Sequence, residues 1–193
     1  MRLDGTSLRM CPAIVAAAAC MLAVTAAPAA AQSGGSTVPS SEPAPAPTTT
    51  TAGVATLNAD GSATPPADAP RAVRKAINAA NKIRYKPYLY GGGHRSFKSK
   101  GYDCSGAVSY VLHAAGLLKR PLPSGAFVKG WGSPGTGQWI TVYANKGHMY
   151  AVIAGLRWDT SAVGEPANNG SGPRWRSTAR GPTGYTSKYW AGL

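Results

Sequence analysis

The sequence predicts an α+β domain in which two helices are followed by an antiparallel meander of strands. Two patterns lead to this prediction. Apolar residues recur at helical spacing in two segments between residues 70 and 116, and three short runs with strand character follow residue 137. The chain has 193 residues, of which 44% are hydrophobic. This is sufficient for one packed domain with a tail.

The first helix is expected to begin after Asp68, which can cap it, with Pro70 in its first turn. Val73, Ile77 and Ala80 then recur on one face of the helix. The helix is expected to end before residue 87, which is proline.

The second helix is expected to hold Cys104 and Ser105 in its first turn and to end at Gly116. Its apolar face follows the spacing i, i+3, i+4, i+7 and consists of Val108, Val111, Leu112 and Ala115. Residues 119–137 are rich in proline and glycine, which predicts a loop.

Three strands are expected over 138–143, 148–154 and about 156–161, with the last turn at Gly155. The segment 164–193 is rich in Gly and Pro, with aromatic residues spaced along it. We expect this extension to wrap the domain in mostly irregular structure.

Residues 1–31 resemble a secretory signal peptide, because Arg2 and Arg9 precede a short alanine-rich apolar run that ends in small residues. We expect cleavage before Gln32 and no stable membrane insertion; a lipid on Cys20 is the alternative. Residues 32–69 are dominated by Ser, Thr, Ala and Pro, which predicts a disordered linker before a domain over 70–193.

The chain carries a formal charge of +13, and residues 70–193 hold 18 Lys and Arg against three acidic residues. This surplus predicts an anionic partner. No basic repeat or recognition-helix pattern accompanies it, which argues against nucleic acid. For an exported protein the nearest polyanion is the cell wall, and we expect a secreted, wall-associated monomer. Because no CxxC, H-E-x-x-H or phosphate-binding loop is present, we expect no metal and no cofactor.

Once residues 1–31 are removed, Cys104 is the only cysteine. A lone thiol in an exported protein is a nucleophile, a dimerising bridge or a buried inert group. The predicted helix N-terminus favours the nucleophile, because it stabilises a thiolate and presents N–H groups to an oxyanion.

A cysteine nucleophile needs a base, and the chain has three histidines. His113 lies nine residues further along the predicted helix, about 13 Å away, so it cannot reach Cys104. His148 opens a strand, where a sheet can hold it rigidly, and we favour it over His94. His94 then remains as a group on the substrate side.

A third polar group is expected to orient the imidazole. With a two-residue turn at Gly155-Leu156, Asp159 lies opposite Val152, on the same face as His148. A turn one residue earlier brings Asp159 closer to His148. We select Asp159, with Thr160 and Ser161 as alternatives.

These residues resemble a family pattern. PYLYGG at 87–92, GYDCSG at 101–106 and GHMYAVIAG at 147–155 are similar to the motifs of the NlpC-type papain-like cysteine peptidases of bacterial cell walls. The resemblance covers residues 71–162. It implies a papain-like fold with helices packed on a small antiparallel sheet, and hydrolysis of amide bonds in peptidoglycan stem peptides without a metal.

By this resemblance Cys104 is the nucleophile and His148 the base. Tyr88 contributes its hydroxyl to the substrate or the oxyanion. Ser105 lines the recognition pocket, and Asp103 fixes the turn or contacts a substrate amine.

The chain also departs from the family pattern. The P-G-D segment that precedes the histidine in the family is replaced by PGTGQWITVYANKG at 134–147, without the aspartate. Two other functions therefore stay open: a catalytically weak or inactive wall-binding module of the same fold, and an acyltransferase or amidase that attacks a different bond.

Overall fold

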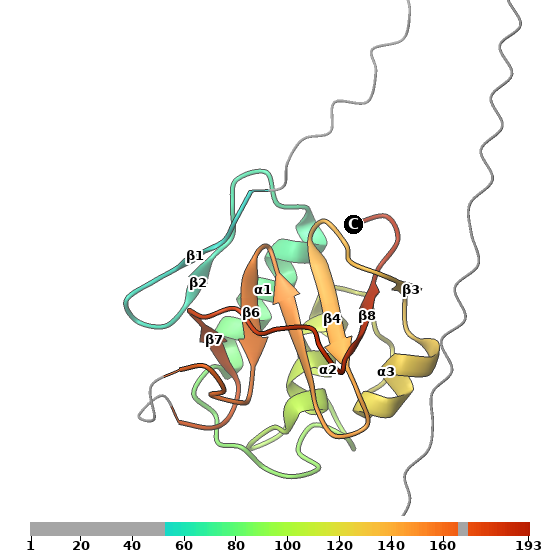
Figure 1. Ribbon diagram of the computed structural model, residues 1–193. Helices are drawn as coiled ribbons and strands as arrows, with labels where there is room; N and C mark the ends of the chain where they lie inside the picture. The colour runs from blue at the N-terminus through green and yellow to red at the C-terminus, as the bar shows by residue number, and fades with distance from the viewer. Residues whose placement is uncertain (1–52, 166–169) are drawn as a thin grey trace, which may run out of the picture. The chain divides into compact units, whose positions relative to one another are not determined.

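The computed structural model describes residues 53–165 and 170–193 (Figure 1). The predicted signal peptide at 1–31 and the first part of the predicted linker, 32–52, lie outside the described residues. No helix within the described ranges is long and apolar enough to cross a membrane.

The two predicted helices are present and pack against each other on one face of the sheet (Figure 1). Their bounds are α1 (Arg71–Ile83) and α2 (Cys104–Ala114). Asp68 does not cap α1: its carboxylate accepts a hydrogen bond from the Gly53 amide, and Pro70 is the N-cap without a side-chain bond. The α2 helix ends as expected at Gly116, whose positive φ of 82° suits glycine.

Within the described residues, six strands form one antiparallel sheet in the order β3-β8-β4-β5-β6-β7. The three predicted strands are its centre: β4 (Ile140–Ala144), β5 (Met149–Ile153) and β6 (Leu156–Asp159). Buried side chains of β5 and β6, including Met149, Ile153 and Trp158, face the helices and form the core with those of α1 and α2. This α+β architecture is the predicted fold class.

The turn between β5 and β6 fixes the register of the sheet. Ile153 pairs with Leu156, so the two turn residues are Ala154 and Gly155, both with positive φ (45° and 79°). This geometry matches the twist of a tight hairpin. The turn therefore lies one residue earlier than Gly155-Leu156. The register places Asp159 next to the Trp158–Ala151 pair, two positions nearer to His148 than Val152.

The C-terminal extension is not simply irregular. It contributes two strands to the sheet, β7 (Arg174–Arg176) beside β6 and β8 (Thr186–Tyr189) between β4 and β3 (Ser133–Pro134). The Gly- and Pro-rich composition of the extension did not predict either strand. Both strands form because the edges of β4 and β6 offer backbone groups for pairing. The segment 119–137 also differs from the expected loop, since it contains α3 (Ser124–Gly130).

The end of the expected linker is folded. Residues 53–69 contain a two-stranded hairpin of β1 (Thr56–Leu57) and β2 (Ala63–Thr64). The Asn81 side chain of α1 accepts from the Ala63 N–H and donates to the Ala63 carbonyl, at 2.9 and 2.8 Å. Ala55 donates to the Ala154 carbonyl at 2.8 Å. Amino-acid composition does not reveal such long-range hydrogen bonds, and for this reason the sequence predicted a linker over residues 53–69.

Candidate active site

Cys104 is the first residue of α2, and Asp103 is the N-cap. The Asp103 carboxylate accepts from the Gly106 amide at 2.7 Å, which leaves the amides of Cys104 and Ser105 pointing outward. Neither of these two N–H groups has an acceptor among the described residues. Cys104 is buried, with 9% of the residue exposed, and it belongs to the hydrophobic core beside the start of the helix.

The glycine-rich loop lies directly against the start of α2. A Cβ atom at Gly106 would overlap the carbonyl oxygen of Gly92. The Asp103 amide donates to the same oxygen at 3.3 Å, and the Gly91 amide donates to the Asp103 carboxylate at 3.1 Å. Backbone therefore packs on backbone, and the glycines of both motifs are required to bring the loop to Cys104.

His148 immediately precedes β5 and interacts with both Cys104 and Asp159. Its Nε2 lies 2.9 Å from Oδ1 of Asp159, which leaves Nδ1 for the thiol. Burial alone lowers the pKa of His148, but hydrogen bonds to Asp159 and Cys104 outweigh this effect and raise the pKa to about 9. The imidazole is therefore cationic at neutral pH.

Asp159 is the buried partner of His148, and its side chain is 0% exposed. Oδ1 also accepts from the Ser161 amide at 2.9 Å, and Oδ2 lies 3.0 Å from Nη1 of Arg180. Burial acts to raise the pKa of Asp159, but the hydrogen bonds from His148 and Ser161 and the charges of His148 and Arg180 hold it below the usual value.

The two alternatives to Asp159 do not contact the imidazole in this way. The Thr160 hydroxyl has no hydrogen-bond partner in the described part of the chain. The Ser161 hydroxyl accepts from the Val163 amide, and the Ser161 backbone supports Asp159. Of the three residues considered, Asp159 has the geometry of the orienting group.

The three residues expected to bind substrate surround the thiol. Tyr88 is 43% exposed, and burial together with the nearby Cys104 and Asp103 raises the pKa of its hydroxyl. Asp103 accepts from the Gly106 and Gly91 amides, from the Ser105 hydroxyl at 3.1 Å, and contacts His94 at 2.9 Å. Its lone pairs are taken, so of its two expected roles the structure favours fixing the turn.

The other two histidines have different partners. His94 Nε2 lies 2.9 Å from the Ser105 hydroxyl and within hydrogen-bond distance of Asp103, the two residues that flank Cys104 in the chain. His113 stacks on Phe97 with ring centroids 3.8 Å apart and contacts the Leu118 carbonyl. His113 is structural, as its position along α2 predicted.

Sequence reasoning did not identify Arg180 or Tyr185 as part of the site. Arg180 contacts Asp159, and the Tyr185 ring lies edge-on to His148 at 6.5 Å. Both residues come from the connection between β7 and β8. No motif marks them, and the only available signal was the presence of Arg and Tyr in a segment thought to be irregular.

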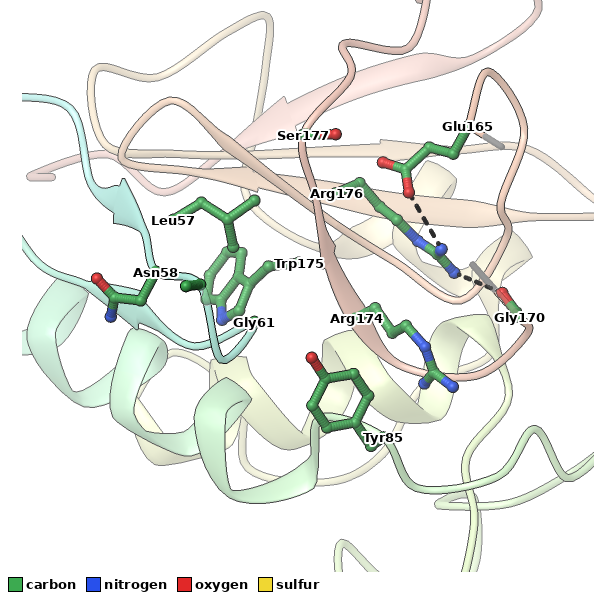
Figure 2. A pocket seen from close by; sticks show the side chains of 11 residues that line it. Leu57, Asn58, Gly61, Tyr85, Glu165, Gly170, Arg174, Trp175, Arg176 and Ser177 are labelled. Atoms are coloured by element: carbon green, nitrogen blue, oxygen red, sulfur yellow. Dashed lines mark hydrogen bonds and ion pairs between the residues drawn. The ribbon is translucent and has the colours of Figure 1, made fainter. Parts of the chain in front are cut away.

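A separate pocket of about 420 Å³ lies between the β1–β2 hairpin and β7 (Figure 2). The guanidinium of Arg174 lies 5.0 Å from the Tyr85 ring, and Arg176 is paired with Glu165 at 3.4 Å. None of the lining residues is Cys104, His148 or Asp159. The pocket is therefore distinct from the candidate active site.

No group of three or more His, Cys, Asp or Glu residues is placed to hold a metal ion within residues 53–165 and 170–193. The groups at the site are instead a thiol, an imidazole, a carboxylate and free helix amides. Together they can perform nucleophilic acyl transfer.

No family model matches the sequence, and no curated protein matches it either. Several solved structures are similar to it, among them the following three. Rv1477, a hypothetical invasion protein of Mycobacterium tuberculosis, is 22% identical with a TM-score of 0.42, over 62% of this chain and 64% of that one. A variant of the resuscitation promoting factor interacting protein RipA is 23% identical with a TM-score of 0.43, over 62% of each chain. The P60 domain of the M. avium subspecies paratuberculosis antigen MAP1204 is 16% identical with a TM-score of 0.40, over 61% of this chain and 94% of that one. The matched region thus spans less than two thirds of the first two proteins.

Proposed function

We propose that this protein is an exported cysteine peptidase that hydrolyses amide bonds in peptidoglycan stem peptides. One observation carries the proposal: Cys104, at the first residue of α2, meets an imidazole whose other nitrogen is held by a buried carboxylate. A cysteine, a cationic imidazole and a carboxylate that orients the imidazole are the arrangement typical of nucleophilic catalysis, whereas a purely structural thiol does not require it.

In the first half of the proposed reaction the Cys104 thiolate attacks the amide carbonyl carbon. The amides of Cys104 and Ser105 donate to the oxyanion that forms, and the Tyr88 hydroxyl lies near Cys104. As the C–N bond breaks, His148 gives its Nδ1 proton to the leaving amine. The acyl group remains on sulfur as a thioester.

In the second half a water molecule attacks the thioester, and neutral His148 accepts the proton from that water. The C–S bond breaks, the acid product leaves and the thiolate–imidazolium pair is restored. Asp159 does not exchange a proton in either half: it holds the ring orientation through Nε2 and stabilises the imidazolium.

The choice of substrate rests on charge and on motif resemblance. The formal charge of +15 over residues 70–193 suits an anionic polymer, and the Tyr-Gly-Gly, D-C-S-G and Gly-His motifs resemble those of wall peptidases. Export through the segment 1–31 would bring the domain to that polymer.

Mass spectrometry of soluble fragments, after incubation of the full chain with purified peptidoglycan, tests this function. We expect stem-peptide fragments from the unchanged protein and a loss of about 10⁴-fold or more in Cys104→Ala, because the nucleophile is removed. His113→Gln, on the same helix, is the matched control and should remain active. Equal digestion by the unchanged protein and Cys104→Ala would exclude the peptidase.

The basic surface also suits a second function, a wall-binding module without turnover. In that case the same incubation gives salt-sensitive binding to the wall but no fragments from the unchanged protein.

A further inference from the structure

Arg180 lies outside the catalytic motifs but contacts the buried carboxylate behind His148. It belongs to the connection between β7 and β8, 21 residues after Asp159 in the chain. Its Nη1 lies 3.0 Å from Oδ2 of Asp159, and its Nη2 donates to the hydroxyl of Tyr185 at 2.8 Å. The side chain is only 15% exposed, so solvent screens this ion pair weakly.

Aromatic rings hold the guanidinium in place. Its carbon lies 5.5 Å from the centre of the Tyr150 ring and 5.4 Å from that of Tyr185. The Tyr185 ring in turn lies edge-on to both Tyr150, at 5.2 Å, and His148, at 6.5 Å. The guanidinium of Arg180 is thereby flanked by two aromatic rings, which favour a nearby positive charge.

The two oxygens of Asp159 have separate partners. Oδ1 is shared by His148 and the Ser161 amide, whereas Arg180 is the donor to Oδ2. Arg157 also faces Oδ2, but its Nε is 3.7 Å away and makes no hydrogen bond within the described residues. Without Arg180, Oδ2 would be buried without a hydrogen bond, and rotation of the carboxylate toward Arg157 would withdraw Oδ1 from His148.

We propose that Arg180 is a positioning residue that fixes the Asp159 carboxylate so that Oδ1 faces the imidazole of His148. The connection between β7 and β8 then contributes a positioning residue to the site, so the residues required for the site extend beyond 71–162. The role of this geometry in catalysis rests on the proposed peptidase function, but the geometry itself can be tested without substrate.

The charged and titratable groups that face the His148–Asp159 pair come from several elements. They are Cys104 on α2, Tyr150 on β5, Arg157 on β6, Arg176 on β7, and Arg180 and Tyr185 after β7. Removal of Arg180 has two opposite effects on His148: the loss of a nearby positive charge raises the pKa, and the loss of the Asp159 hydrogen bond lowers it. If Arg180 is a positioning residue, the second effect is the larger.

The test is a pH titration of the His148 ring by NMR in the full chain. In the unchanged protein we expect a midpoint near pH 9. In Arg180→Ala we expect a fall of about one unit or more, and in Arg180→Lys a smaller fall, because Lys keeps the charge without the planar fork. Arg174→Ala removes another arginine of the C-terminal extension, one that lies against Tyr85, and should leave the midpoint unchanged.

An unchanged midpoint in folded Arg180→Ala would overturn the proposal, and so would a raised midpoint, because a rise means that Arg180 acts only through its charge. If Arg180→Ala does not fold, Tyr185→Phe removes only the acceptor of Nη2 and should still lower the midpoint slightly. A protein with the expected titrations that releases no wall fragments would contradict the peptidase while leaving the positioning role of Arg180 intact.

Discussion

Two neighbouring side chains, a carboxylate and a thiol, raise the pKa of His148 and keep its imidazole charged at neutral pH. The Asp159 carboxylate is fully buried and accepts from Nε2, and the Cys104 thiol lies on the other side of the ring. Burial by itself works against the imidazolium, so the ring would be neutral at pH 8 without these partners. The site therefore depends on a buried ion pair, and breaking such a pair from one side is costly.

The raised pKa of His148 predicts the alkaline limit of activity. The imidazolium donates the proton to the leaving amine, so hydrolysis should decline as the pH rises through about 9. In Asp159→Asn the carboxylate that favours the charged ring is lost, and the decline should move toward the ordinary histidine value of about 6.5. The pH dependence of kcat/KM on a stem-peptide substrate measures both limits.

Thr160→Val is the matched control for Asp159→Asn, because Thr160 is the buried neighbour whose hydroxyl has no partner in the described part of the chain. Its alkaline limit should stay near pH 9. An Asp159→Asn profile that coincides with the unchanged one would contradict the orienting role.

The start of α2 and the glycine-rich loop pack closely, backbone against backbone. Residues 103–106 supply an N-cap, a thiol and a glycine in a single turn, and the loop reaches them because Gly93 and Gly106 lack side chains. Gly106 lies inside a helix, where glycine is about 1 kcal/mol less favourable than alanine. Its presence there is explained by the close approach of the Gly92 carbonyl.

Gly106→Ala should therefore destabilise the fold although alanine is the better helix former. The added methyl overlaps backbone that cannot move aside easily, and we expect a cost of about 1–3 kcal/mol in the free energy of unfolding. Urea unfolding measures it. The control is Gly125→Ala in α3, where a Cβ meets nothing within 4 Å, and there the free energy should stay the same or rise slightly.

The six-stranded sheet joins parts of the chain that are far apart in sequence. β8, close to the C-terminus, pairs with β4 along four residues and with β3, and the connection that precedes it carries Arg180 and Tyr185. The extension thus closes one edge of the sheet and supports the candidate site at the same time.

Truncation of the chain after residue 185, which removes β8, should be severely destabilising. The edge of β4 then loses its partner, and β3 has no strand to pair with. Domains of this size have about 5–15 kcal/mol of stability, so loss of the strand that pairs with both β3 and β4 should abolish cooperative unfolding. Circular dichroism during thermal unfolding tests this, and truncation after residue 190, which retains β8, should keep the cooperative transition.

Local patterns were sufficient for the two helices and the three central strands. They also led to the choice of Cys104, His148 and Asp159 as site residues, which stays a prediction that the short distance between His148 and Asp159 supports. Each is encoded within a few neighbouring positions: helical spacing of apolar residues, an N-cap before the thiol, and a histidine at the start of a strand. The β5–β6 register was left between two turns that differ by one residue, because both place a glycine in the turn. Positive φ at Ala154 as well as Gly155 is a property of the folded hairpin.

Only the tertiary structure decided the rest. The folding of residues 53–69, the strands β7 and β8, and the contact of Arg180 with Asp159 all depend on partners many positions away. Contacts with such distant partners produce no periodic pattern in the sequence. The free energy of strand pairing and of ion pairing depends on which strand edge or buried charge lies nearby once the core has formed. The residues proposed as nucleophile and base thus lie in short sequence motifs, whereas Arg180 and Tyr185, which contact Asp159 and His148, come from the end of the chain.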